Sequence, residues 1–223
     1  MPAVTAARTA VVSIGGDDVY EDLFGVGNAL QNLLTSLGYS TSLRIGMGWL
    51  DGEAPALVVL YSAMGQLDES RMTRLLEAVD RGTGVLVVHS TAVLPMEGDL
   101  AVPPFDRAFD LFGSRYGSHG PQPHSSIFTV HLDPDHPITA GIQPFDIDHE
   151  HYELVPSSPV TVVAWREAPY GREPIMHVRE HGAGRVCYLQ LGHDTRAFDE
   201  PGVRALVGGA TRWLDRSSTR EGH

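Results

Sequence analysis

Three short apolar runs rich in β-branched residues recur in the first ninety residues of the chain, at 9–14, 57–62 and 84–90. Nearly every position in each run is apolar, which is typical of strands covered on both faces in a parallel sheet. Between the runs, apolar residues recur at spacings of three and four over 23–37 and 72–79, as on one face of a helix. This alternation predicts an α/β fold with right-handed crossovers and a doubly wound sheet.

The second half of the chain has a different pattern. Residues 95–125 are rich in Pro and Gly and contain one short helical stretch at 105–112, so we interpret them as a long functional loop. Strand-like runs follow at 126–131, 160–165, 175–178 and 185–191. A last amphipathic helix is predicted over 203–214. We expect the chain, 1–223, to form a single domain with a core of about 8–215.

The composition indicates a soluble globular protein. Hydrophobic residues make up 42% of the chain and charged residues 20%, and no apolar run approaches the ~20 residues that a membrane span needs. The first residues lack the charged, apolar and small-residue segments of a signal peptide, so we expect a cytoplasmic protein with no membrane partner. The one cysteine, Cys187, cannot form an internal disulfide, which agrees with a reducing compartment.

The charged residues exclude several functions. All sixteen cationic residues are arginine, so no lysine is present to form a Schiff base with pyridoxal phosphate or to bind phosphate in a nucleotide loop. Gly15 and Gly16 could place an anion at a helix N-terminus, but Asp17 and Asp18 would repel a phosphate there. The net charge of −12 would also repel a phosphate backbone. We therefore expect no nucleotide cofactor and no nucleic-acid partner.

Histidine is the residue type most relevant to chemistry, because nine of the eleven histidines lie within 119–193. The densest group is the segment Asp-His-Glu-His-Tyr at 148–152. On a strand, His149 and His151 would point to one face and Glu150 to the other. Either face could contribute to a metal site or to an acid/base pair, whereas the alternative is a polar edge strand with solvated histidines.

Two further histidines follow predicted buried strands. His193 comes after one apolar run and precedes Asp194, and His89 ends another and precedes Ser90. Ligands of doubly wound sheets bind beyond the carboxyl ends of the strands, so both positions favour a binding site. The alternatives are a His193 ring that caps the next turn and a His89 ring that is satisfied near the core. His119 lies on a rigid, Pro-containing loop that could reach over a pocket.

A cysteine or serine nucleophile is not expected. Cys187 lies in the middle of a predicted strand, which is the place of a small buried hydrophobe and not of an exposed thiolate. Ser90 follows a strand as a nucleophilic serine would, but His89 and Thr91 flank it in place of the glycines of a G-x-S-x-G turn.

Five segments in order along the chain carry a family resemblance. They are GVLVVH at 84–89, FGSRYGSH at 112–119, DPDHPITAGI at 133–142, FDIDHEHY at 145–152 and GAGRVCYLQLGHD at 182–194. Together these motifs resemble the ThuA-like, trehalose-utilisation family. The resemblance implies a fold similar to that of class I glutamine amidotransferases, a flavodoxin-like, mostly parallel sheet with helices on both faces.

The resemblance also concerns the two histidines at strand ends. His193 looks like the amidotransferase histidine, and the turn at His89 and Ser90 looks like the position of the cysteine nucleophile. No cysteine is present there, so glutamine hydrolysis through a thioester is excluded. The chain also departs from the family pattern, because Asp17 and Tyr20 lie in a loop where many members carry a histidine.

The resemblance implies a role in sugar metabolism. Members look like partners of sugar dehydrogenases that oxidise the carbon-3 hydroxyl of a glycoside to a ketone, and such a ketone acidifies the hydrogen at carbon 2. We therefore expect an enzyme that removes this proton and then eliminates, hydrolyses or isomerises the oxidised sugar or glycoside. A divalent metal ion could assist by stabilising the enolate oxygen. A sugar dehydrogenase acting upstream is the expected partner, and a homo-oligomer is left open.

The expected site combines three groups of residues. The candidate bases are Glu150, His193 and His151. The residues expected to bind substrate are His89, Ser90, Asp17, Tyr20, Tyr152 and Asp194. The candidate metal ligands are His119 and His149.

Two other functions are compatible with the same residues. The first is a non-catalytic carbohydrate-binding or regulatory subunit on an amidotransferase-like scaffold, because a fold does not determine a function. The second is a metal-dependent hydrolase of unoxidised glycosides. It would need two carboxylates on either side of one bond, and only Asp148 and Glu150 offer such a pair.

Overall fold

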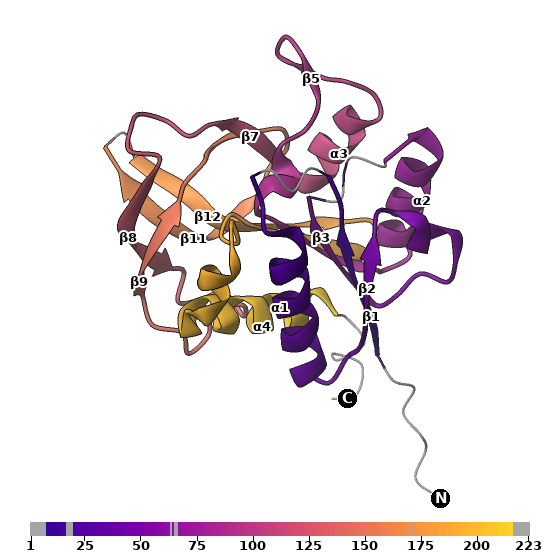
Figure 1. The fold of residues 1–223 in the computed structure, drawn as a ribbon, viewed down its shortest axis with the longest axis horizontal. Helices are drawn as coiled ribbons and strands as arrows, with labels where there is room; N and C mark the ends of the chain where they lie inside the picture. Colours follow the sequence, from indigo (N-terminus) through magenta and orange to yellow (C-terminus); the bar gives the residue numbers. More distant parts are fainter. Residues whose placement is uncertain (1–7, 17–19, 63, 65–66, 170, 216–223) are drawn as a thin grey trace, which may run out of the picture.

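The computed structural model describes residues 8–16, 20–62, 64, 67–169 and 171–215. Within these residues the main sheet has nine strands. They are β1 (Thr9–Ile14), β2 (Ser40–Ile45), β3 (Leu57–Tyr61), β4 (Gly84–Val88), β8 (Ser125–Leu132), β9 (Phe145–Glu150), β11 (Thr161–Ala168), β12 (Gly171–His181) and β13 (Gly184–Leu189). Their order across the sheet is β2-β1-β3-β4-β13-β12-β11-β8-β9. The fold is therefore a mixed α/β fold built on one large sheet (Figure 1).

Strands β2, β1, β3, β4 and β13 form a parallel half of the sheet. The predicted strands 9–14, 57–62 and 84–90 are β1, β3 and β4, and every residue of β3 and β4 is buried, as unbroken apolar runs indicate. β2 is not evident from its sequence, Ser-Thr-Ser-Leu-Arg-Ile, because it is a partly exposed edge strand with few apolar positions.

Helices cover both faces of this parallel half. Helices α1 (Leu23–Ser36) and α4 (Pro201–Leu214) pack on one face, and α2 (Glu69–Asp80) and α3 (Phe105–Phe112) pack on the other. Alternate residues of β3 serve the two faces, since Tyr61 belongs to the first apolar cluster and Leu60 to the second. Figure 1 shows α1 and α4 side by side. No helix in the described part of the chain is long and apolar enough to cross a membrane.

The other half of the sheet is antiparallel. The antiparallel pairs are β13 with β12, β12 with β11, β11 with β8, and β8 with β9. The expectation of a mostly parallel sheet therefore holds only for five of the nine strands in the described residues. The reason is local: β12 and β13 are joined by a tight turn at Gly182, which has φ +55°, and a turn this short can join only antiparallel strands.

Two small sheets lie beyond the main one. One pairs β7 (Ser114–Ser118) with β10 (Glu153–Pro156), and the other pairs β5 (Met96–Glu97) with β6 (Leu100–Ala101). The predicted long loop at 95–125 is therefore partly ordered as short strands around α3, whose bounds match the predicted helix at 105–112. Cys187 is fully buried in β13, as its mid-strand position predicts.

Candidate functional site

A cavity of about 500 Å³ lies beyond the carboxyl ends of the parallel strands. Segments that follow four of these strands line it: Glu21 comes after β1, Ser62 after β3, Ser90 after β4 and His193 after β13. The antiparallel half contributes Glu150, the last residue of β9. Open α/β sheets bind ligands at this edge, and the volume is that of a small-molecule site.

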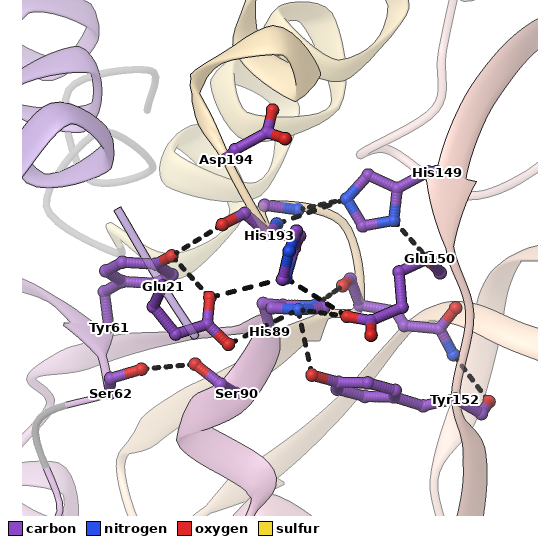
Figure 2. Close-up of polar contacts among 12 residues, drawn as sticks. Glu21, Tyr61, Ser62, His89, Ser90, His149, Glu150, Tyr152, His193 and Asp194 are labelled. Atoms are coloured by element: carbon purple, nitrogen blue, oxygen red, sulfur yellow. Dashed lines mark hydrogen bonds and ion pairs between the residues drawn. The ribbon is translucent and has the colours of Figure 1, made fainter. Parts of the chain in front are cut away.

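Glu150 is the centre of the polar cluster in this cavity (Figure 2). Its Oε2 lies 3.1 Å from Nε2 of His89 and 3.2 Å from Nδ1 of His193. Its Oε1 lies 2.6 Å from Nε2 of His119. The structure thus brings Glu150, His89, His119 and His193 together, although they come from four separate segments of the chain.

His89 is held in a strained backbone conformation with φ +47°, directly after β4. Such a conformation is uncommon for a residue with a side chain, and strained residues of this kind cluster at functional sites. The ring is fully buried, and its Nδ1–H donates to the carbonyl oxygen of Gln190 over 2.6 Å. That bond directs Nε2 towards Glu150, while the ring stacks on Tyr152 with centroids 4.5 Å apart.

A pair of serines follows the two neighbouring strands. Ser62 has φ +51°, and its hydroxyl forms a short hydrogen bond with the hydroxyl of Ser90. The backbone N–H of Ser62 donates to Oγ1 of Thr91 over 2.8 Å, which ties the two strand ends together. Both serine side chains line the cavity, so they can donate hydrogen bonds to a polar ligand.

Glu21 is one of the site residues that sequence reasoning missed, together with Ser62 and Tyr116. Its carboxylate lies 3.8 Å from Nε2 of His89 and 3.7 Å from Nδ1 of His193. The hydroxyl of Tyr61, the buried last residue of β3, donates to it over 2.8 Å. The available signal was its place in the loop after the first strand, beside Tyr20.

His149 holds the loop that carries His193. Its Nε2 accepts the backbone N–H groups of Gly192 and His193 over 3.0 and 3.2 Å, and its Nδ1–H donates to the backbone carbonyl of Glu150. Burial lowers the pKa of His149 to about 4, so the ring is neutral near pH 7, as acceptance at Nε2 requires. Both nitrogens are engaged with backbone atoms. Contrary to expectation, His149 therefore has no nitrogen free for a metal ion.

The charge of the cluster is set by these contacts. Burial would raise the pKa of Glu150, but the close imidazoles of His193 and His89 outweigh burial and hold the pKa far below its usual range. Contact with Glu150 in turn raises the pKa of His193. Glu150 is therefore an anion near neutral pH, and it faces histidines with no arginine bound to it in the described part of the chain.

The remaining lining residues give the cavity an aromatic and aliphatic wall. The wall includes Tyr20, which is 77% exposed, together with Met64 and Tyr116. The hydroxyl of Tyr116 forms a hydrogen bond of 2.7 Å with Nδ1 of His119. The hydroxyl of Tyr152 lies 2.9 Å from Nε2 of His89. Such a wall can pack against the apolar face of a ligand while the opposite wall binds its polar groups.

Three residues expected at the site are not placed in it. His151 is buried against Phe128 and is not among the residues that line the cavity. Asp194 points away from the cluster (Figure 2). It accepts from the backbone N–H of Arg196 over 2.9 Å and forms an ion pair with the side chain of the same residue. Asp17 lies outside the described residues.

The family assignment follows from the sequence as a whole. The family model for ThuA, described as trehalose utilisation, matches residues 53–214, which is most of the chain. The chain therefore belongs to the ThuA family. No functionally curated protein matches the sequence.

Solved structures with similar folds include two from the same family. A ThuA-like protein from Parabacteroides merdae is 16% identical with a TM-score of 0.72, over 94% of this chain and 91% of that one. A ThuA-like protein from Bacteroides uniformis is 17% identical with a TM-score of 0.65, over 97% of both chains. A β-galactosidase from Bacillus circulans sp. alkalophilus is 14% identical with a TM-score of 0.64, over 93% of this chain but 31% of the enzyme. At these identities the likeness concerns the fold alone.

Proposed function

We propose that this chain is a carbohydrate-active enzyme that removes the carbon-2 proton of a 3-keto sugar or glycoside. The observation that carries the proposal is Glu150, an ionised carboxylate that lines the cavity and contacts His89, His119 and His193. The ionised form is the one that accepts a proton from carbon, and a substrate that displaces a histidine from Glu150 would raise the pKa of the carboxyl and make it a stronger base. Membership of a trehalose-utilisation family supports a sugar as the substrate.

The proposed reaction starts with Glu150 as the base. When Glu150 takes the proton, the electron pair of the C–H bond at carbon 2 is delocalised onto the keto oxygen at carbon 3 as an enolate. That pair then forms the double bond between carbons 1 and 2 while the bond from carbon 1 to its oxygen substituent breaks. The leaving oxygen takes a proton from His119, whose other ring nitrogen is hydrogen-bonded to Tyr116. Addition of water to the unsaturated product then gives overall hydrolysis. Isomerisation diverges after the proton has left carbon 2. The C1–O bond then stays intact, the electron pair forms a double bond between carbons 2 and 3, and the keto oxygen is protonated to give an enediol. Loss of the proton from the carbon-2 hydroxyl and protonation of carbon 3 then move the carbonyl to carbon 2.

The substrate must come from an oxidation, because the ketone is what acidifies carbon 2. A sugar dehydrogenase that acts on the carbon-3 hydroxyl is therefore the proposed supplier. Ser62 and Ser90 offer hydroxyl groups for the polar edge of the sugar, and Tyr20 offers an aromatic face for its C–H groups.

We also propose the flavodoxin-like, amidotransferase-type description for the parallel half of the sheet. Its order β2-β1-β3-β4-β13 supports this, since it is the order 2-1-3-4-5 of doubly wound flavodoxin-like sheets. The site lies where that order places ligands, beside the ends of β1 and β3. The amidotransferase chemistry does not follow, because His89 and Ser90 occupy the turn after β4 and Cys187 is buried in β13.

Matched substrates test the proposal. A nitrophenyl 3-keto-glucoside and its unoxidised parent differ only at carbon 3, and we expect release of nitrophenol from the ketone alone, above the rate in buffer. The unoxidised parent has no carbonyl next to carbon 2, so a positioned base cannot make removal of that hydrogen practical. Equal release from both compounds would instead show direct hydrolysis. Binding of either compound without turnover would favour a carbohydrate-binding subunit.

A further inference from the structure

We infer that Glu21, His89 and His193 bind one divalent transition-metal ion at the base of the cavity. One side-chain atom from each of these residues lies within 4.8 Å of the other two. The inference goes beyond the proposed reaction, because binding of an ion can be measured with no substrate present. It also differs from the pair His119 and His149 expected from the sequence, since both nitrogens of His149 are engaged elsewhere.

The hydrogen bonding of His89 is the first argument. Its Nδ1–H donates to the carbonyl oxygen of Gln190, so a neutral ring presents the lone pair of Nε2 to the cavity. A metal-bound histidine almost always donates its other ring N–H to a carbonyl or carboxylate in this way. The ring is fully buried, so its direction is fixed by the surrounding chain.

The groups that face Nε2 are the second argument. They are the carboxylates of Glu150 and Glu21, at 3.1 and 3.8 Å. A lone pair directed at two carboxylates is repelled unless a proton or a cation lies between them. The hydroxyl of Tyr152 is also near Nε2, but the two rings stack at an interplanar angle of 19°, so the phenol approaches the face of the imidazole and not its in-plane lone pair.

Charge balance is the third argument. Glu21 and Glu150 are two carboxylates in one partly buried cluster, with side-chain exposures of 9% and 17%. Their ion-pair partners in the described part of the chain are histidines alone, with no arginine. A divalent cation would neutralise both carboxylates and leave the histidines uncharged.

The spacing and rigidity of the donors are the fourth argument. Nδ1 of His193 lies 3.7 Å from Glu21, and neighbouring ligands of a tetrahedral zinc ion lie about 3.4 Å apart. Each donor is held from behind: Glu21 by Tyr61, His89 by Gln190, and the loop of His193 by His149. The two distances from Glu21 to the histidines are therefore close to those between ligands of one ion.

The donor set also indicates the class of ion. Two imidazoles and a carboxylate suit zinc, manganese, iron, cobalt or nickel, whereas magnesium prefers oxygen ligands only. Under the proposed function, such an ion would lie beside Glu150 and could polarise the keto oxygen of the substrate.

Calorimetric titration of the chelator-treated full chain with Zn²⁺ or Mn²⁺ tests the inference. We expect one ion per chain, no comparable binding of Mg²⁺, and a higher melting temperature with the ion bound. Glu21→Gln and His193→Asn should each weaken binding by about 100-fold or more, since each removes a ligand. Glu150→Gln should retain one ion per chain because the three donors remain. The matched control is His181→Asn, whose histidine pairs with Asp80 outside the cavity.

Absence of stoichiometric binding would overturn the inference and show a cluster held together by protons. The same conclusion would follow if the Glu21 and His193 variants bound the ion as tightly as the wild-type chain. Because His89 is buried and its replacement could prevent folding, the absorption spectrum of the Co²⁺-loaded wild-type chain provides a second readout of nitrogen and oxygen ligands. If the wild-type chain binds the ion but does not process a 3-keto-glycoside, the metal site is confirmed and the proposed function is wrong. If it processes the substrate but binds no ion, the proposed function stands and the metal site is wrong.

Discussion

Replacing Glu150 by glutamine should lower the turnover of a 3-keto-glycoside by about 10²–10⁴-fold, the usual contribution of a positioned base. The amide keeps the volume of the side chain but cannot accept a proton from carbon. Substrate should still bind, because the serines and the aromatic wall are unchanged. Steady-state rates and a binding titration with the same ketone check both parts of this expectation.

The matched control is Asp148→Asn, which removes a carboxylate from the same strand at an exposed position. It should leave turnover within a factor of about two, since surface changes away from special features have small effects. His193→Asn separates the two candidate bases. If His193→Asn abolishes turnover and Glu150→Gln does not, the assignment of Glu150 as the base is wrong.

Replacing Gly209 by alanine should destabilise the fold by about 3 kcal/mol or more, at the upper end of overpacking effects. A Cβ at this position of α4 would lie 2.0 Å from the backbone carbonyl oxygen of Ile138. The new Cβ is fixed to the backbone of α4, and the atom that it meets belongs to the backbone of Ile138, so neither can move aside as a flexible side chain would. The helix would have to move away from the residues that follow β8. Urea unfolding followed by circular dichroism measures the free energy of unfolding.

The neighbouring residue provides the control. A Cβ at Gly208 would approach nothing closer than 3.5 Å, and that atom is the end of the flexible Arg212 side chain. Gly208→Ala should therefore be neutral or stabilise α4 by up to about 1 kcal/mol, because alanine favours a helix interior over glycine. Equal losses in the two variants would contradict the close approach of Gly209 to Ile138.

The parallel half of the fold could be predicted because its signals are local. Apolar runs mark β1, β3 and β4, and the N-cap Asp68 marks the start of α2 by accepting from the backbone N–H of Arg71. In the antiparallel half, the strands themselves could be predicted, but their directions and their pairing partners could not. A short apolar run has the same appearance in either direction, so pairing is decided by turns and by partners distant in sequence.

Some residues of the candidate site could also be predicted from local signals, whereas others depend on contacts between distant segments. Strand-end positions indicated His89 and His193, and both line or border the cavity. Glu21 was missed because one carboxylate in an acidic loop carries no distinctive pattern, and its importance depends on Tyr61 and His193. The backbone contacts of His149 could not be predicted, because two of its three partners, Gly192 and His193, lie more than forty residues away in the sequence.

Site-specific hydrogen exchange is the most direct test of the proposed proton abstraction. In a 3-keto-glycoside the hydrogens at carbon 2 and carbon 4 both lie next to the carbonyl, so only a positioned base distinguishes them. In deuterated water we expect the enzyme to exchange the carbon-2 hydrogen well above the rate in buffer and to leave carbon 4 unchanged, as followed by proton NMR, and we expect Glu150→Gln to abolish the effect. Equal exchange at the two carbons, or turnover with no deuterium at carbon 2 of substrate or product, would contradict proton abstraction by Glu150.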